Sequence, residues 1–383
     1  MSAPSFRFRY GPRVLSGPGT AGQVADHLPA GPCLLVTDKG VRSLGLLAPV
    51  LEALEKAGIP VSIFDAVEPD PSRETVLATV AAGRAAGAVS VLGVGGGSPM
   101  DVAKLAAYLL ASGDDLETIW GVEQAKGKRL PLLLVPTTAG TGSEATPVTV
   151  ISVGNGEKRG VSAGVLLPNV SVLDPLLTLG LPPHVTAATG IDAMVHAIES
   201  YTSARLKNPM SDMLAREALR LLSANLLKAC RTPGDVEARS AMLLGAHLAG
   251  VAFANAPVAG VHALAYPLGG LFHVPHGLSN ALVLPHVMAF NMPVTAPLYA
   301  ELAPLVDPSL AGLSPSAQAE GLVAAMVTLS RESGLPQQMR AVGVTEADLP
   351  QMAKDAMLQQ RLLVNNPRPI LEADALAIYQ AAW

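Results

Sequence analysis

Strand-length apolar runs alternate with helical segments through the first half of the chain. The apolar runs lie at residues 33–38, 60–64, 88–94 and 130–135. The stretches that follow the first three runs have a helical pattern, at residues 44–57, 72–86 and 99–110. Continuous apolar strands separated by helices are typical of a parallel sheet that is covered on both faces. The first half therefore predicts an α/β fold built on a parallel sheet.

The second half of the chain has a different pattern. After about residue 181 no convincing strand remains, and long helical segments follow at residues 186–203, 209–229, 233–256 and 317–332. A chain of 383 residues is also too long for one typical hydrophobic core. We therefore predict an α/β domain at residues 1–180 and an all-helical domain at residues 181–383.

Composition and charge exclude several classes of protein. Half of the residues are hydrophobic and 15% are charged, so the chain can bury a large core and is not disordered. The net charge of −5 comes without a run of like charges, which argues against a nucleic-acid partner. The longer apolar runs are interrupted by Gly or Pro, so no membrane span is predicted. The first ten residues lack the apolar region of a secretory signal, and we expect a cytoplasmic protein.

A glycine-rich loop follows the apolar run at residues 88–94. Gly95, Gly96 and Gly97 would let a phosphate approach the backbone closely, because they have no side chains. Ser98 and Asp101 form a capping pattern that would begin a helix, and a helix N-terminus attracts anions. The loop matches neither the usual Rossmann fingerprint nor a Walker loop. It indicates a phosphate-binding loop, and the alternative is a tight turn that binds no ligand.

A second polar loop follows the apolar run at residues 130–135. It carries Thr137, Thr138, Thr141 and Ser143. Ligands bind at the carboxyl ends of strands in open parallel sheets, where these hydroxyl groups would suit contacts to a nucleotide. A polar surface loop is the alternative interpretation.

Asp38 ends the first strong apolar run. A carboxylate at the end of a strand can accept hydrogen bonds from ribose hydroxyls and would repel a 2′-phosphate, which favours NAD over NADP. A helix-capping role for Asp38, just before Lys39 and Gly40, fits the sequence equally well.

Four residues of the second half suit a metal site. Asp192 and His196 are four residues apart, which in a helix places both side chains on one face. His262 and His276 complete the set, and Pro267 is expected to break any helix between them. Three imidazoles and one carboxylate suit Fe(II) or Zn(II). The alternative is that these are ordinary buried histidines.

Together these motifs resemble the iron-containing (group III) alcohol dehydrogenases. The resemblance covers nearly the whole chain and rests on residues 95–104, 136–144, 190–199, 275–288 and 366–369. It implies an α/β N-terminal dinucleotide-binding domain and an all-α C-terminal metal-binding domain, with the active site in the cleft between them. It also implies Fe(II), in some members replaced by Zn(II), on Asp192, His196, His262 and His276.

The resemblance implies further residues and a quaternary structure. Asp70 and Lys158 stand where the family often has residues near the nucleotide. Members commonly form homodimers through an N-terminal strand, and residues 6–10 alternate as such an edge strand would.

One position departs from the family. Several members carry a second histidine four residues after the third ligand, and it has been assigned to proton transfer. Tyr266 stands there in this chain, and the ordinary tyrosine pKa of about 10 makes it a poorer acid–base group at neutral pH. His273 is the other candidate for the proton relay, although it also suits a surface or supporting position.

We therefore expect a metal-dependent dehydrogenase that uses NAD. A primary alcohol or diol would bind Fe(II) as its alkoxide and pass a hydride to NAD, giving the aldehyde. Two alternatives are a Zn-dependent polyol dehydrogenase of the glycerol type and a non-redox lyase like dehydroquinate synthase. The lyase would need several Lys and Arg residues near the ligands, and the helical half supplies few.

Overall fold

The computed structural model describes residues 5–154 and 157–383. The chain divides into two compact units, one formed by Tyr10–Gly180 and the other by Leu181–Trp383 together with Met1–Arg9. The change from strands to helices at about residue 181 was read from the sequence, but the grouping of the N-terminal segment with the helical unit was not. Each unit is described by itself below.

The α/β unit is built on a six-stranded sheet in which all strands run parallel. In spatial order the strands are β1 (Arg13–Ser16), β9 (Val170–Leu173), β6 (Leu132–Pro136), β4 (Ser90–Gly95), β2 (Cys33–Val36) and β3 (Val61–Phe64). Every residue of the four central strands is buried, which explains the apolar runs that predicted β2, β4 and β6. The edge strand β3 was also predicted, whereas β1 and β9 were not. The predicted parallel α/β fold of this half is confirmed.

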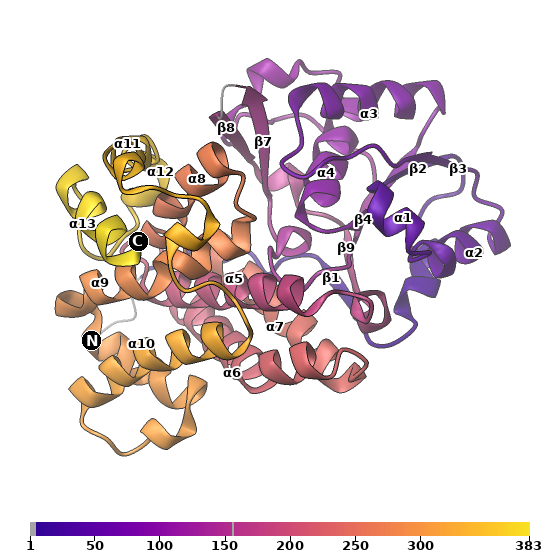
Figure 1. Ribbon diagram of the computed structural model, residues 1–383. Coiled ribbons are helices and arrows are strands. Elements are labelled where there is room, and N and C mark those ends of the chain that lie inside the picture. Colours follow the sequence, from indigo (N-terminus) through magenta and orange to yellow (C-terminus); the bar gives the residue numbers. More distant parts are fainter. Residues whose placement is uncertain (1–4, 155–156) are drawn as a thin grey trace. The chain divides into compact units, whose positions relative to one another are not determined.

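Helices cover both faces of this sheet (Figure 1). On one face Leu34 and Val36 pack in a cluster with α3 (Arg73–Ala85) and α4 (Gly97–Ser112). On the other face Cys33 and Leu35 pack with the 3₁₀ helix η1 (Thr20–His27), α1 (Lys39–Ser43) and α2 (Ala48–Lys56). Successive side chains of a strand point to opposite faces, so β2 contributes to both cores. Of the helix predicted at residues 44–57, α2 forms only Ala48–Lys56, and the separate short helix α1 precedes the predicted range.

A second, smaller sheet in this unit was not predicted. It has the order β5 (Gly121–Val122), β8 (Glu157–Ser162) and β7 (Val148–Gly154), and β7 and β8 pair antiparallel. These strands are only partly buried and contain polar and charged residues. They therefore lack the continuous apolar runs that identified the central strands.

The other unit is helical, and no strand occurs among the described residues after Gly180. Its helices are α5 (Pro183–Thr202), α6 (Pro209–Arg231), α7 (Val236–Asn255), α8 (Gly260–Phe272), α9 (His276–Val306), α10 (Pro315–Glu332), α11 (Leu349–Ala356), α12 (Gln360–Leu363) and α13 (Glu372–Ala382). α5 is buried along most of its length and packs against α6, α7 and α9. A Cβ on Gly190 of α5 would lie 2.5 Å from Leu226 and 2.7 Å from Met242, so glycine permits this close packing.

The prediction that Pro267 breaks the helix was wrong. Pro267, Gly269 and Gly270 all lie inside α8, which ends only at Phe272. α9 is likewise continuous over 31 residues although it contains four internal prolines. An internal proline costs a helix about 3 kcal/mol or more in isolation. Here α8 and α9 pack against each other and against neighbouring helices, and these contacts offset the loss.

α9 is also long and apolar enough to cross a membrane by length and composition. Its buried residues pack against α5, α8, α10 and α13, as expected of a core helix. The predicted edge strand at residues 6–10 is absent from the described residues 5–12. Instead, the backbone N–H and C=O of Arg9 pair with the side-chain amide of Asn255 on α7, at 2.7 and 2.9 Å.

Candidate metal centre and nucleotide loops

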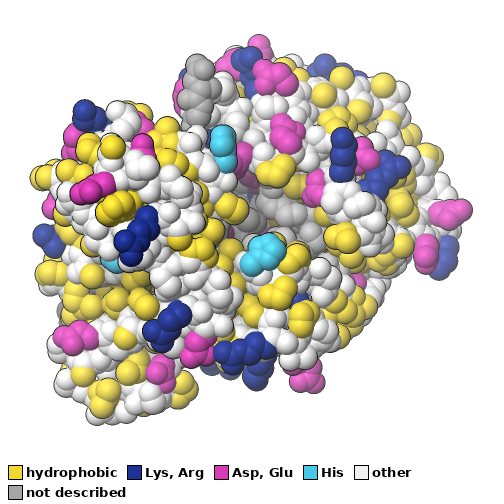
Figure 2. Space-filling model, viewed as in Figure 1, with side chains coloured by type: hydrophobic (Ala, Val, Ile, Leu, Met, Phe, Trp, Pro, Cys, Tyr) yellow, Lys and Arg dark blue, Asp and Glu magenta, His cyan; other side chains and the backbone are white. Residues whose placement is uncertain are grey.

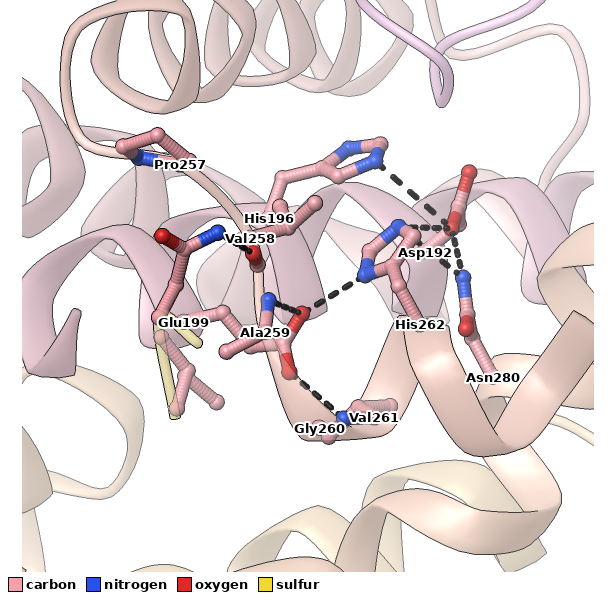
Figure 3. Close-up of polar contacts among 12 residues, drawn as sticks. Asp192, His196, Glu199, Pro257, Val258, Ala259, Gly260, Val261, His262 and Asn280 are labelled. Atoms are coloured by element: carbon pink, nitrogen blue, oxygen red, sulfur yellow. Dashed lines mark hydrogen bonds and ion pairs between the residues drawn. The ribbon is translucent and has the colours of Figure 1, made fainter. Parts of the chain in front are cut away.

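Asp192, His196, His262 and His276 come together in the helical unit. One ligand atom from each lies within 4.8 Å of all the others. From Asp192 Oδ1, the Nε2 atoms of His196 and His262 lie at 3.9 Å and that of His276 at 3.6 Å. Figure 3 shows the side chains of His196 and His262 turned toward the Asp192 carboxylate. Three helices thus bring one carboxylate and three imidazoles to a common point.

The fold explains why these side chains meet. Asp192 and His196 lie one turn apart on α5, and His262 lies in the first turn of α8. His276 is the first residue of α9, and Gly277 follows it. A Cβ on Gly277 would lie 2.4 Å from the Ala188 carbonyl oxygen of α5, so only glycine lets α9 begin this close to α5. The role of Gly277 was missed, because its spacing from the histidines carries no signal in one sequence.

Aromatic packing orients the imidazoles. The rings of His196 and His262 stack, with centroids 4.8 Å apart and an interplanar angle of 21°. Phe253 of α7 lies against His196 with ring centroids 4.5 Å apart. Asp192, His196 and His262 are buried, whereas the His276 side chain is 41% exposed. The four residues are therefore packed against other side chains on one side and exposed to solvent at His276.

The donor atoms fit a divalent cation. The side-chain nitrogen of Asn280 lies 2.6 Å from Asp192 Oδ1 and 3.3 Å from the Nε2 atoms of both His262 and His276. The Asn280 amide nitrogen thus lies among atoms from three of the four residues. One carboxylate oxygen and three imidazole nitrogens, with no thiolate, suit Fe(II) or Zn(II).

The charge on Asp192 is stabilised by its surroundings. Burial acts to raise the pKa of this carboxyl group, but the imidazoles of His196, His276 and His262 and the Asn280 amide act in the opposite direction. The net result is a lowered pKa. Asp192 therefore carries a negative charge at neutral pH, as a metal-binding carboxylate requires.

In the α/β unit, the glycine-rich loop joins β4 to α4. The prediction that Ser98 caps this helix was wrong: α4 begins at Gly97, and its N-cap is Gly96, which has no side chain to cap the first turn. Asp101 does not cap it either. Its Oδ1 accepts a hydrogen bond of 2.6 Å from Ser143 Oγ, and its Oδ2 accepts one of 2.9 Å from the N–H of Val150. The helix N-terminus is thus left without a side-chain cap, which suits an anion.

The second polar loop lies against the first. The N–H of Thr137 donates to the Gly95 carbonyl at 2.9 Å. A Cβ on Gly96 would lie 3.6 Å from Thr138 Oγ1, and one on Gly97 would lie 3.0 Å from the Thr141 methyl group. The two loops, which were predicted separately, therefore form one surface at the carboxyl ends of β4 and β6.

Lys104 joins the two loops; it is the last residue of the motif at residues 95–104, but no role was predicted for it. Its side chain is fully buried, and Nζ donates to Ser143 Oγ and to the Val148 carbonyl, each at 2.7 Å. Burial lowers the pKa of Lys104, whereas the carboxylates of Asp101 and Glu144 act to raise it. In the sequence, a lysine one helical turn after Asp101 looks like an exposed helix residue, so the burial of Lys104 could not be predicted.

The remaining predicted cofactor residues lie in the same unit. Asp38 caps α1, because its Oδ1 accepts a 2.8 Å hydrogen bond from the Val41 N–H. Its other oxygen lies 3.4 Å from the position of a Cβ on Gly95, so it also faces the glycine loop. Asp70 and Lys158 form an ion pair of 2.6 Å. The residues that the resemblance placed near the nucleotide thus contact each other.

The two candidates for the proton relay lie on α8 and at its end. Tyr266 is half-buried and stands one helical turn after His262. His273 is exposed and follows the helix in the left-handed conformation, with φ of 54°. Neither belongs to the group of four ligand residues.

A parallel α/β unit with an uncapped glycine loop, together with a helical unit that brings one carboxylate and three histidines to one point, is the combination expected of a nucleotide-dependent dehydrogenase. Comparison with known proteins assigns the chain to a family. The model of the iron-containing alcohol dehydrogenases matches residues 11–175, and that of the C-terminal part of the Fe-containing alcohol dehydrogenase family matches residues 186–383. The chain belongs to the iron-containing alcohol dehydrogenase family, as the resemblance predicted.

Individual relatives agree with this assignment. Long-chain-alcohol dehydrogenase 1 of Geobacillus thermodenitrificans (strain NG80-2) is 42% identical over 353 residues, which cover 91% of this chain and 89% of the relative. The 1,3-propanediol dehydrogenase of Klebsiella pneumoniae is 39% identical, covering 99% and 97%. The crystal structure of a 1,3-propanediol oxidoreductase superposes with a TM-score of 0.95 at 38% identity, covering 99% of this chain and all of the other. The prediction of an alcohol dehydrogenase is confirmed.

A further solved structure bears on the cofactor. The sulfoacetaldehyde reductase of Bifidobacterium kashiwanohense, in complex with NAD⁺, superposes with a TM-score of 0.86 at 27% identity, covering 99% of each chain. This relative therefore binds NAD⁺, the cofactor that was predicted for the present chain.

Proposed function

We propose that this enzyme oxidises primary alcohols or diols with NAD and reduces the corresponding aldehydes with NADH, with Fe(II) held by Asp192, His196, His262 and His276. The observation that carries the proposal is the convergence of these four side chains on one point. The named activities of the relatives, on long-chain alcohols and 1,3-propanediol, support this substrate class. Zn(II) is the alternative metal, because the donor set suits both ions.

Each set of residues has a distinct task in this reaction. The bound ion would act as a Lewis acid that lowers the pKa of the substrate alcohol. Asp192 balances part of its charge, and the stacked rings of His196 and His262 fix the direction of their lone pairs. The uncapped N–H groups in the first turn of α4 would hold the pyrophosphate of NAD, a cofactor that supplies the hydride acceptor when bound.

The oxidation also releases a proton. Of the two predicted relay residues, we propose Tyr266, because it stands on α8 one turn after the ligand His262 and faces the same side of the helix. His273 is exposed beyond the end of α8.

The proposed activity is tested by supplying the Fe(II)-loaded enzyme with a panel of primary alcohols, diols, polyols and secondary alcohols, and measuring NAD reduction. We expect the highest kcat/KM with a primary alcohol or a terminal diol. A protein that oxidises only polyols such as glycerol, or no alcohol at all, would contradict the proposal.

The preference for NAD over NADP is proposed to depend on Asp38. Asp38→Gly should raise kcat/KM with NADP at least about tenfold, equivalent to about 1.4 kcal/mol, because it removes the repulsion of the 2′-phosphate. Glycine is tolerated at the N-cap of α1 at a cost of only a few tenths of a kcal/mol, so the fold should be kept. Steady-state kinetics with both cofactors measure the change. A wild-type enzyme that already prefers NADP would overturn this role for Asp38.

The glycine loop offers a test of nucleotide binding. Gly96 has an extended backbone, with φ of −77°, and an added Cβ would make only ordinary contacts. We expect Gly96→Ala to change the free energy of unfolding by less than about 0.5 kcal/mol. It should nevertheless weaken NAD binding about tenfold, because the methyl group occupies the space in which a phosphate approaches the backbone.

Gly95→Ala is the matched comparison. At Gly95 φ is 152°, and an added Cβ would lie 2.7 Å from Pro99 Cγ, so this variant should lower the melting temperature. Isothermal titration measures the loss of NAD affinity and thermal unfolding measures the loss of stability, so the two variants can be told apart. Unchanged NAD affinity in Gly96→Ala would show that no phosphate approaches this backbone.

We further propose that the enzyme is a cytoplasmic homodimer acting on small molecules. Phe6 and Tyr10 of the N-terminal segment are exposed, as expected of a segment that pairs with a second copy. Among the described residues on the face in Figure 2, basic side chains are scattered between acidic ones, which suits a small-molecule substrate better than nucleic acid. Light scattering should give twice the chain mass of 39.3 kDa. A monomer at micromolar concentration would contradict the dimer.

A further inference from the structure

Glu199 is a buried carboxylate that belongs to no predicted site. It lies on α5, three residues after His196, and only 4% of it is exposed. Its Oε1 accepts the Val261 N–H at 2.6 Å. Its Oε2 accepts the Ala259 N–H at 3.0 Å and contacts Nδ1 of His262 at 2.6 Å. Figure 3 shows this carboxylate between the start of α8 and the His262 ring.

The position of Glu199 stabilises the beginning of α8. The first N–H groups of a helix have no partners inside the helix, and they form its positive end. Two of the N–H groups here donate to Glu199, and that of Gly260 donates to Asn366 at 3.3 Å. The turn that carries His262 is therefore fixed by side chains from outside α8.

The contact with His262 also determines which ring nitrogen carries the proton. An ionised carboxylate can only accept hydrogen bonds, so Nδ1 of His262 must be the donor. In the neutral ring the other nitrogen then has a free lone pair. That nitrogen, Nε2, faces the Asp192 carboxylate at 3.9 Å and the Asn280 amide at 3.3 Å. The lone pair therefore points at the site where the four ligands converge.

We propose that Glu199 is a positioning residue of the metal centre, which holds His262 in the Nδ1–H tautomer and directs Nε2 to the metal. Carboxylates in this relation to a ligand histidine raise its basicity, and their loss typically weakens metal binding 10- to 100-fold. The proposal rests on the metal site of the proposed function.

Glu199→Gln tests the role with little change in shape. Glutamine offers one acceptor oxygen for the three donors, and its NH₂ group must face at least one of them. If the NH₂ group faces His262, Nδ1 becomes the acceptor and the proton moves to Nε2, where it blocks the lone pair. We expect Co(II) and Zn(II) binding, measured by competition with a chelator, to weaken 10- to 100-fold. The visible absorption of the Co(II) form should change as well, because one imidazole is lost or displaced.

Asn365→Ala is the matched control. The Asn365 side-chain amide donates to the Val258 and Arg361 carbonyls, each at 3.0 Å, so it also holds the approach to α8, but through contacts with the backbone and not with His262. This variant should lower the melting temperature and leave the affinity for Co(II) and the Co(II) spectrum unchanged. Equal loss of metal affinity in both variants would show that Glu199 acts only by stabilising α8.

A second measurement does not depend on the folding of Glu199→Gln. The ¹⁵N chemical shifts of His262 in the metal-free wild-type enzyme, assigned by their loss in His262→Gln, should show a protonated Nδ1 and a bare Nε2. The opposite tautomer would overturn the proposal, as would full Co(II) affinity in Glu199→Gln. A wild-type enzyme that binds no metal at all would instead contradict the metal site itself, and the role of Glu199 with it.

Discussion

Replacing His276 with alanine is expected to remove the metal and to lower kcat/KM for alcohol oxidation about a thousandfold or more, which corresponds to about 4 kcal/mol. His276 supplies one of the four converging ligand atoms. Its side chain is 41% exposed at the first residue of α9, so its removal leaves no cavity in the core. The variant should therefore fold and bind NAD as the wild type does. Metal analysis, NAD titration and steady-state kinetics on one preparation check all three expectations.

His286→Ala is the control for this variant. His286 lies ten residues further along α9 and is partly buried, and burial lowers its pKa, but it contributes nothing to the ligand group. This variant should keep the metal and the activity. Normal turnover in His276→Ala would show that His276 is not needed to hold the metal.

Lys104→Met is expected to have the opposite effect: the metal is retained and nucleotide binding is weakened. Methionine has nearly the length of lysine but leaves the Val148 carbonyl without its buried donor. We expect the free energy of unfolding to fall by about 1–3 kcal/mol. NAD affinity should fall at least about tenfold, because the tie between the two nucleotide loops is lost.

Lys126→Met is the matched control, since Lys126 is exposed in the same unit. It should change the free energy of unfolding by less than about 0.5 kcal/mol and leave NAD affinity intact. Denaturant unfolding and NAD titration compare the two variants. If Lys104→Met binds NAD normally, the buried lysine stabilises the fold without shaping the nucleotide loops.

The sequence was most informative where burial is uniform or periodic. The central strands are buried on both faces, so they appear as unbroken apolar runs, and helices such as α6 show clear periodicity. The spacing of Asp192 and His196 also follows directly from helical geometry.

Features that depend on tertiary contacts were not predictable in this way. Pro267 was expected to break a helix, but packing against neighbouring helices keeps α8 intact, as it does α9 with its four internal prolines. Glu199, Lys104 and Gly277 look like ordinary helix residues in the sequence. Their roles depend on contacts with other helices and loops, and no local sequence pattern indicates such contacts.

The most direct test of the metal centre is elemental analysis of the enzyme purified without oxygen and loaded with Fe(II), combined with its activity. We predict one ion per chain, loss of activity when a chelator removes it, and recovery when Fe(II) is returned. Zn(II) in its place should restore activity no better than Fe(II). A fully active enzyme that carries no stoichiometric metal would contradict the role assigned to Asp192, His196, His262 and His276.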